Sequence, residues 1–202
     1  MLTIALPKGR IADETLDRFE KAFGEKFVFE DRKLILEKSG FKFLNVRNQD
    51  VPTYVMHGAA DLGVVGLDVL EEKEYDLIKL LDLKLGRCKV AFGLRAGEKL
   101  NFDKSKITIA TKHEKIAKKY FEEKAMTVEI IKLYGSIELA PLVGLCDCIV
   151  DIVETGETMK QNGLEVGPTI MESSAHLISS KNSFYAKKDL ILDLKEKIEV
   201  FL

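Results

Sequence analysis

One stretch, CIVDIVETGETMKQNG from Cys148 to Gly163, constrains the fold of this chain more than any other. It begins with an apolar run of the kind found in buried parallel strands, and the run ends in the small and polar residues Glu154–Thr158. A short helix is expected after them, with Asn162-Gly163 as its end signal. The stretch therefore predicts a strand, a tight turn and a helix, which is the repeating unit of α/β folds.

The turn in this stretch is also a candidate anion site. Backbone N–H groups point outward at the start of a helix, the helix dipole adds positive charge, and Gly156 lets a phosphate approach the main chain. Thr155 and Thr158 offer hydroxyl groups, and Asp151, three residues before Glu154, can direct a carboxylate at ligand hydroxyls such as those of a ribose. The alternative is an ordinary turn in which Thr155 is the N-cap of the helix.

The rest of the chain repeats the alternation of apolar strands with amphipathic helices. A first strand, Leu2–Leu6, leads through Pro7-Lys8-Gly9-Arg10 into a helix that Gly24 closes. Next we expect a hairpin of Phe27–Phe29 with Leu34–Leu36. The other expected strands are Phe41–Val46, Leu62–Gly66, Leu77–Leu81, Cys88–Leu94, Ile107–Ala110, Val128–Leu133, Glu165–Met171 and Ala175–Ser179. The pattern predicts two α/β lobes with parallel sheets and a ligand cleft between them.

Composition narrows the classes of function. The 202 residues carry a formal net charge of −2, which argues against a general nucleic-acid binder, and no apolar run is long enough to cross a bilayer. The N-terminus enters a strand at once, without a basic leader, and the three cysteines suit a reducing compartment, so we expect a cytoplasmic protein. Cys146 and Cys148 are expected to point to the same face as small core residues rather than metal ligands.

Taken together, the motifs of this chain resemble those of the ATP phosphoribosyltransferase family, which opens histidine biosynthesis. The segments that carry the resemblance are LPKGR at Leu6–Arg10, RNQDVPTYV at Arg47–Val55, ADLGVVGLDVL at Ala60–Leu70, LGRCKVAFG at Leu85–Gly93, IATK at Ile109–Lys112 and GSIELAPLVGLCDCIVDIVETGETMKQNGL at Gly135–Leu164. The last is the most specific, because the phosphoribosyl-binding loop of the family has this form.

The resemblance implies two α/β domains similar to a type II periplasmic binding protein, with the active site in the interdomain cleft. Domain I would comprise residues 1–90 and 176–202, and domain II residues 91–175. Because the chain stops at Leu202, it resembles the short form of the family, which works with a regulatory subunit similar to histidyl-tRNA synthetase. Self-association as a dimer is also expected.

The implied reaction joins N1 of the ATP adenine to C1 of phosphoribosyl pyrophosphate and releases pyrophosphate, with Mg²⁺ bound to the substrate. The catalytic candidates are Lys8, Arg10 and Arg32. The substrate-binding candidates are Gly9, Arg47, Asp68, Thr111, Glu138, Asp151, Glu154, Thr155, Gly156, Glu157 and Thr158.

Two other functions are compatible with the same pattern. A two-lobe fold also serves modules that bind small anions or amino acids without catalysis, and fold alone does not separate the two. A different phosphoribosyltransferase would present the same ribose-phosphate half of the site. The phosphate loop with Asp151, together with Lys8-Gly9-Arg10, favours the ATP phosphoribosyltransferase.

Overall fold

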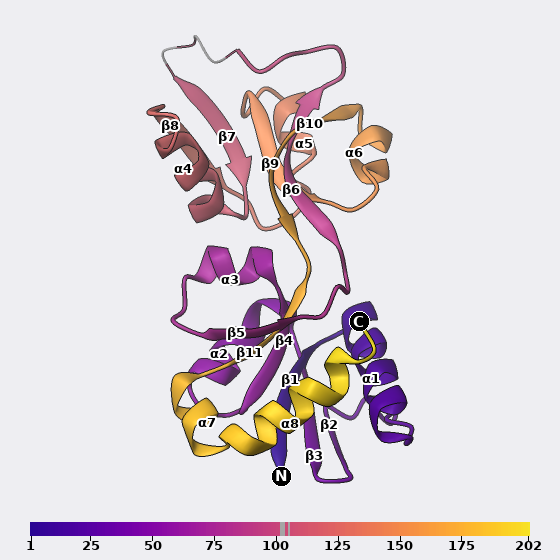
Figure 1. Ribbon diagram of the computed structural model, residues 1–202. Helices are drawn as coiled ribbons and strands as arrows, with labels where there is room; N and C mark the ends of the chain where they lie inside the picture. The colour runs from indigo at the N-terminus through magenta and orange to yellow at the C-terminus, as the bar shows by residue number, and fades with distance from the viewer. Residues whose placement is uncertain (102–103, 105) are drawn as a thin grey trace. The chain divides into compact units, whose positions relative to one another are not determined.

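A computed structural model describes residues 1–101, 104 and 106–202 (Figure 1). The chain forms two compact units, unit 1 comprising Met1–Gly86 with Ser174–Leu202, and unit 2 comprising Arg87–Ser173. The domain boundaries expected from the sequence lie a few residues further along the chain at both crossings. No helix in the described part of the chain is long and apolar enough to span a bilayer.

Unit 1 contains a six-stranded sheet with the order β2-β3-β1-β4-β11-β5. Its strands are β1 (Leu2–Pro7), β2 (Ile35–Lys38), β3 (Phe41–Val46), β4 (Leu62–Gly66), β5 (Ile78–Asp82) and β11 (Ala175–Ser179). Its helices are α1 (Arg10–Phe23), the 3₁₀ turn η1 (Asn48–Asp50), α2 (Val51–Met56), α3 (Leu67–Lys73), α7 (Lys181–Ala186) and α8 (Lys188–Glu199). Gly24 ends α1 in the left-handed conformation, as its position predicts.

Alternate residues of the central strands enter two separate cores, one on each face of the sheet. On one face, α1 and α8 pack over a cluster rich in phenylalanine, with Phe19 at its centre. On the other, α2 lies so close to β4 that a Cβ on Gly63 would meet side chains of Val51 and Val55 at 2.8 Å. This close approach requires glycine at that position.

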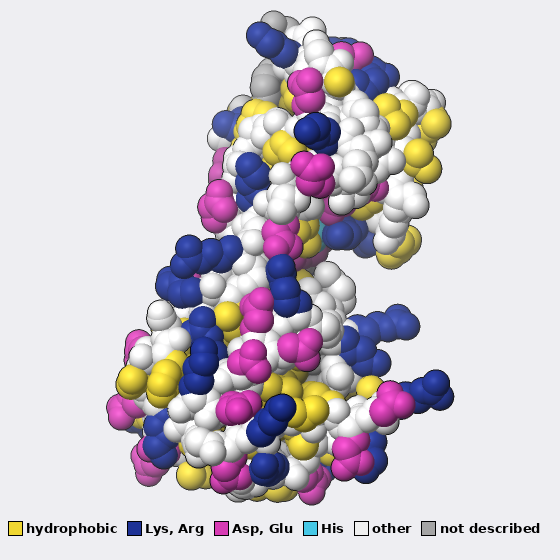
Figure 2. Space-filling model, turned by 90° about the vertical axis from the view of Figure 1, so that its right-hand side faces the viewer, with side chains coloured by type: hydrophobic (Ala, Val, Ile, Leu, Met, Phe, Trp, Pro, Cys, Tyr) yellow, Lys and Arg dark blue, Asp and Glu magenta, His cyan; other side chains and the backbone are white. Residues whose placement is uncertain are grey.

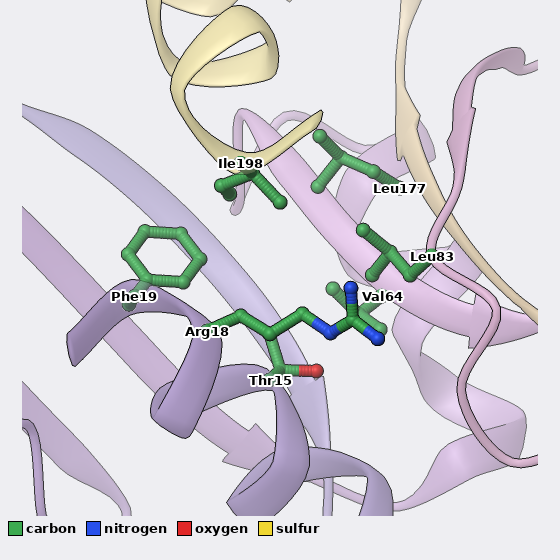
Figure 3. Close-up of a pocket in the computed structure, with 7 residues that line it drawn as sticks. All are labelled: Thr15, Arg18, Phe19, Val64, Leu83, Leu177 and Ile198. Atoms are coloured by element: carbon green, nitrogen blue, oxygen red, sulfur yellow. The ribbon is translucent and has the colours of Figure 1, made fainter. Parts of the chain in front are cut away.

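A crevice between α1, α8 and the sheet is part of the first core (Figure 3). It leaves no space for a water molecule, and its lining is apolar apart from Thr15 and Arg18. The guanidinium of Arg18 donates a hydrogen bond to the carbonyl oxygen of Phe201 at 2.7 Å, which ties the C-terminal end to α1. The crevice is therefore a packing feature and not a ligand site.

The prediction of a hairpin of Phe27–Phe29 with Leu34–Leu36 is wrong, because Phe27–Phe29 forms no strand. β2 instead pairs antiparallel with β3 across a two-residue turn, Ser39-Gly40, whose φ angles are +51° and +83°. Two consecutive positive φ angles match the twist of the flanking strands and are favoured in such hairpins. Phe27 is buried, although it lies outside any strand, because it packs on Phe19 and Phe43.

Unit 2 contains a five-stranded sheet with the order β10-β6-β9-β7-β8. Its strands are β6 (Cys88–Arg95), β7 (Ile107–Thr111), β8 (Val128–Lys132), β9 (Cys148–Val153) and β10 (Leu164–Ser173). Its helices are α4 (Glu114–Glu122), α5 (Leu139–Leu142) and α6 (Glu157–Gln161). Residues of α4 belong to one core of the unit, while α5 and α6 contribute to the other.

Both sheets are mixed, whereas the sequence pattern predicts parallel sheets. In unit 1, β11 runs antiparallel to β4 and β5, and in unit 2, β6 and β10 run antiparallel to their neighbours. Part of the difference arises where the chain passes between the units, because β11 returns to unit 1 between β4 and β5 and runs opposite to both; the hairpin of β2 with β3 adds a further antiparallel pair. In unit 1 the return is fixed by hydrogen bonds from the Leu83 N–H to the Ala175 carbonyl and from the Ala175 N–H to the Leu85 carbonyl, each 2.9 Å.

A side-chain contact supports the same crossing. The hydroxyl of Ser174 donates to Oδ1 of Asp82 at 2.7 Å, and the Lys84 ammonium lies 2.5 Å from Oδ2. Burial alone would raise the pKa of Asp82, but these hydrogen bonds outweigh it and hold that pKa well below its usual range.

Cys146 and Cys148 do not share a face. Cys148 packs in the core that holds β7 and α4, whereas Cys146 packs with α5 and α6. Burial raises the pKa of both thiols, that of Cys148 to about 12. Both are free, buried cysteines that act as small core residues.

Candidate functional site

Unit 2 contains a pocket of about 450 Å³ at the carboxyl end of β9. This volume lies within the range of about 300–1,000 Å³ that is usual for small-molecule sites. Its lining residues are Glu138, Asp151, Ile152, Val153, Glu154, Thr155, Gly156, Thr158 and Met159. Six of the sequence-predicted residues therefore meet in one cavity: Glu138, Asp151, Glu154, Thr155, Gly156 and Thr158.

The loop between β9 and α6 forms one wall of the pocket. Gly156, with φ +84°, is the N-cap of α6, and no side chain forms a capping hydrogen bond there. The alternative that Thr155 is the N-cap is therefore wrong; its hydroxyl accepts only a long hydrogen bond, 3.4 Å, from the Glu157 N–H. Within the described part of the chain, the hydroxyl of Thr158 has no hydrogen-bond partner. Both exposed hydroxyls are thus available to a ligand.

The side of Gly156 that a Cβ would occupy faces the scaffold. A Cβ there would meet Cγ2 of Val166 on β10 at 3.0 Å and Cγ1 of Val153 at 3.9 Å. Glycine is needed both for the positive φ and for this contact. An alanine at this position therefore strains the loop whether or not a phosphate binds.

Asp151 reaches the pocket from the face of β9 that also carries Ile149 and Val153. Its side chain is only 13% exposed, and Oδ1 lies 3.0 Å from the Lys112 ammonium. The same oxygen accepts the N–H of Ile152 at 2.8 Å and lies 3.9 Å from Nε2 of His113. The carboxylate is thus held in one orientation beneath the loop.

Two predicted residues of unit 2 lie outside the pocket lining. Thr111 is completely buried, and its hydroxyl donates to the Val150 carbonyl at 2.6 Å and accepts the His113 N–H at 2.9 Å. These bonds join β7 to β9 and begin the turn into α4. Glu157 is exposed in the first turn of α6.

The predicted residues of unit 1 all lie at the end of its sheet where the parallel strands β1, β3 and β4 finish, which we call the unit 1 edge. β1 pairs in parallel with β3 and β4, and β2 is antiparallel to β3, so the ends of β1, β3 and β4 and the start of β2 meet at that edge. The residues placed there are Lys8, Gly9, Arg10, Arg32, Arg47 and Asp68. The carboxyl ends of parallel strands are the usual ligand-binding edge of α/β sheets.

Most of the side chains at this edge are exposed cations. Lys8, Arg10, Arg32 and Arg47 are exposed, whereas Asp68 is buried at the start of α3. The backbone fixes the turn: the Lys8 N–H donates to the Val46 carbonyl at 2.8 Å, and Gly9, with φ +101°, is the N-cap of α1. Arg10 forms an ion pair of 3.6 Å with Glu14 one turn along the helix.

The two sets of residues suit different kinds of charged group. The unit 2 pocket offers carboxylates and loop N–H groups, which suit a sugar with a single phosphate, while the unit 1 edge offers cations, which suit a polyphosphate. Among the described residues, no group of three or more His, Cys, Asp or Glu side chains is placed to hold a metal ion.

Comparison with known proteins decides the family. The HisG family, described as ATP phosphoribosyltransferase, matches residues 47–200. The chain belongs to the ATP phosphoribosyltransferase family. A relative named ATP phosphoribosyltransferase from Wolinella succinogenes is 68% identical over 197 residues, which cover 98% of this chain and 96% of that protein.

Solved structures confirm the fold of an ATP phosphoribosyltransferase. The ATP phosphoribosyl transferase (HisG:HisZ) complex from Thermotoga maritima contains a chain that is 36% identical, with a TM-score of 0.85, covering 98% of this chain and 97% of that one. The substrate binding protein of an amino acid ABC transporter is 14% identical, with a TM-score of 0.60, covering 98% of this chain and 91% of that one. This second likeness shows the fold alone, two α/β domains similar to a type II periplasmic binding protein.

Sequence reasoning missed two residues of the pocket lining, Ile152 and Met159. It named Lys112, with Thr111 at a helix start, as a possible phosphate contact, whereas the structure places its ammonium against the Asp151 carboxylate. The lysine directly follows β7, and β7 lies beside β9 with Thr111 paired to Val150. The strand pattern alone does not show which strands are neighbours, so this contact becomes visible only in the folded sheet.

Proposed function

We propose that this chain transfers the phosphoribosyl group of phosphoribosyl pyrophosphate to N1 of the adenine of ATP and releases pyrophosphate. The observation that carries the proposal is the unit 2 pocket, in which Asp151, Glu138 and the Glu154–Thr158 loop surround one cavity. The names of the relatives, ATP phosphoribosyltransferase, support the choice of ATP as the acceptor.

In this mechanism the loop N–H groups and the Thr158 hydroxyl bind the 5-phosphate. Asp151 and Glu138 accept hydrogen bonds from the ribose hydroxyls, which fixes the direction in which C1 faces its attacker. Three carboxylates (Glu138, Asp151 and Glu154) line the pocket, and none of its described lining residues is Lys or Arg. The pocket therefore suits a sugar with one phosphate better than a pyrophosphate.

The attacking N1 already has a free lone pair, so the reaction requires no strong general base. The main chemical demand is the negative charge that builds on the leaving pyrophosphate. We assign this charge to Lys8 and Arg10, with Arg32 as a further candidate, and to the Mg²⁺ that accompanies the pyrophosphate as part of the substrate. Gly9 lets the backbone turn between the two cations.

Other roles remain predictions from the sequence. Arg47 is a candidate for a second polyphosphate contact, and Asp68, buried at the start of α3, for a nucleotide contact. Thr111 has its hydroxyl engaged with the backbone, and Glu157 lies outside the pocket lining, so we assign neither a direct contact with substrate.

We further propose that the chain works in the cytoplasm with a regulatory subunit that resembles a histidyl-tRNA synthetase, and that it also forms a dimer. The solved complex from Thermotoga maritima pairs HisG with HisZ, which supports the partner. The three free cysteines are compatible with a reducing compartment. On the face shown in Figure 2, Lys and Arg side chains are interspersed with Asp and Glu, an arrangement that gives no extended basic stripe for nucleic acid.

Incubation of the purified chain with ATP, phosphoribosyl pyrophosphate and Mg²⁺, followed by mass analysis of the products, tests the reaction. We expect slow formation of the N1-phosphoribosyl adduct of ATP, and faster formation once the partner is added. Omission of Mg²⁺ is the control for the metal-bound substrate. Absence of the adduct with the partner present would overturn the proposal, and full histidine-inhibited activity of the chain alone would overturn the need for a partner.

A further inference from the structure

Lys112 and Asp151 form an ion pair between neighbouring strands of unit 2. The Lys112 ammonium lies 3.0 Å from Oδ1 of Asp151, with the lysine 36% and the aspartate 13% exposed. The pair depends on the parallel pairing of β7 with β9, which matches Thr111 to Val150 and so places Lys112, the next residue, beside Asp151. An ion pair this close to a pocket wall differs from an ordinary surface pair, because one partner is mostly buried.

Among the described residues, the hydrogen bond and the ion pairs of the Asp151 carboxylate are all made at Oδ1. Oδ1 contacts the Lys112 ammonium, the Ile152 N–H and, at 3.9 Å, Nε2 of His113. Within the described part of the chain, Oδ2 accepts no hydrogen bond. Because Asp151 lines the pocket, Oδ2 is the oxygen left to accept hydrogen bonds from a ligand.

The ion pair also reduces the repulsion between the pocket and an anionic ligand. Glu138, Asp151 and Glu154 all line it, so an anionic ligand meets three carboxylates. A cation held against one of them offsets part of the repulsion without occupying the space that the ligand needs. Lys112 satisfies this requirement, since it contacts the carboxylate but is not among the lining residues.

We propose that Lys112 is a positioning residue for the ribose: it holds Oδ1 of Asp151 so that Oδ2 faces the ribose hydroxyls. This inference rests on the proposed function, which assigns the pocket to the ribose 5-phosphate. It predicts that Lys112 acts on the recognition of sugar hydroxyls and not on the phosphate.

The test compares binding of ribose 5-phosphate with binding of 2-deoxyribose 5-phosphate by calorimetry. In the parent protein we expect ribose 5-phosphate to bind more tightly. Lys112→Met should weaken the binding of ribose 5-phosphate by about fivefold to tenfold, the value of one hydrogen bond, and should reduce the preference over the deoxy sugar. Lys106→Met is the matched control, because Lys106 forms a similar ion pair, 2.8 Å to Glu129, before the first residue of β7.

A double-mutant cycle with Asp151→Asn makes the test specific. If Lys112 acts through Asp151, Lys112→Met should have little further effect on the preference when Asp151 is already replaced. An equal loss for both sugar phosphates would show that Lys112 contacts the phosphate, and an unchanged preference would show a surface ion pair; either result overturns the proposal. If the parent protein binds neither sugar phosphate, the pocket assignment itself fails, which is a distinct outcome.

Discussion

The unit 1 edge and the unit 2 pocket handle charge in opposite ways. At the unit 1 edge, four exposed cations lie next to strand termini: Lys8 and Arg10 after β1, Arg47 after β3 and Arg32 before β2. In the unit 2 pocket, three carboxylates line the cavity, and positive character comes from the backbone N–H groups of the loop. Long cationic side chains can follow a leaving group as its charge grows, whereas a backbone loop holds a phosphate that does not change. Under the proposed function, the unit 1 cations therefore act in catalysis and the unit 2 loop anchors the substrate.

Arg10→Ala is expected to have the largest effect and to act on kcat. The positive charge of Arg10 should matter most as the pyrophosphate departs, so kcat should fall more than substrate binding weakens. A hydrogen bond to a charged group contributes about 1.5–3 kcal/mol, which corresponds to a loss of roughly tenfold to a hundredfold. Steady-state kinetics with the partner present measures it. Lys21→Ala, in the last turn of α1, controls for the loss of one charge. An unchanged kcat with a raised KM would make Arg10 an anchor and remove the contrast between the regions.

Thr158→Val tests the anchoring role of the pocket. Its hydroxyl caps no helix, so the melting temperature should hardly change. The dissociation constant for phosphoribosyl pyrophosphate should rise about tenfold, the contribution of one charge-assisted hydrogen bond, while ATP binding changes much less. Calorimetry with each substrate separately measures this, and Thr127→Val, at an exposed position outside the pocket lining, is the control. Equal weakening of both substrates would contradict a site dedicated to the ribose phosphate.

Gly156→Ala should lower the free energy of unfolding and is expected to have the smallest effect of the three substitutions. It tests whether the backbone of the loop is rigid. A left-handed residue other than glycine costs about 1–2 kcal/mol, and the contact with Val166 adds to this. Gly97→Ala separates the two causes, because Gly97 has φ +77° and no atom within 4 Å of its Cβ position. Urea unfolding should show a larger loss for Gly156→Ala. Equal losses would mean that the Val166 contact relaxes freely.

The elements of this fold were predictable where the local signal agreed with the tertiary structure. Strand β9, the glycine that closes α1 and the short helix before Asn162 all follow from periodicity and end signals. The first hairpin was not predictable in the same way. The apolar pattern at Phe27 and Phe29 reflects core packing and not a strand: Phe27 contacts the ring of Phe19, and Phe29 packs against the same core. The turn at Ser39-Gly40 places a serine at positive φ, which its residue type does not signal.

The site was predictable as a motif but not as a set of contacts. The loop residues and Asp151 are close in sequence, so the motif alone brings them together. Glu138 joins them through the turn before α5, and Lys112 through the pairing of β7 with β9. Contacts of this second kind depend on strand order, which periodicity does not determine.

The most direct test of the central claim, that the unit 2 loop holds the ribose 5-phosphate, is a titration with ribose 5-phosphate followed by the backbone amide signals in nuclear magnetic resonance. We expect saturable shifts of the amides of Glu154–Thr158, with smaller changes at Lys8–Arg10, because the ligand lacks a pyrophosphate. Loop amides that stay unmoved while other residues respond to the ligand would contradict the claim.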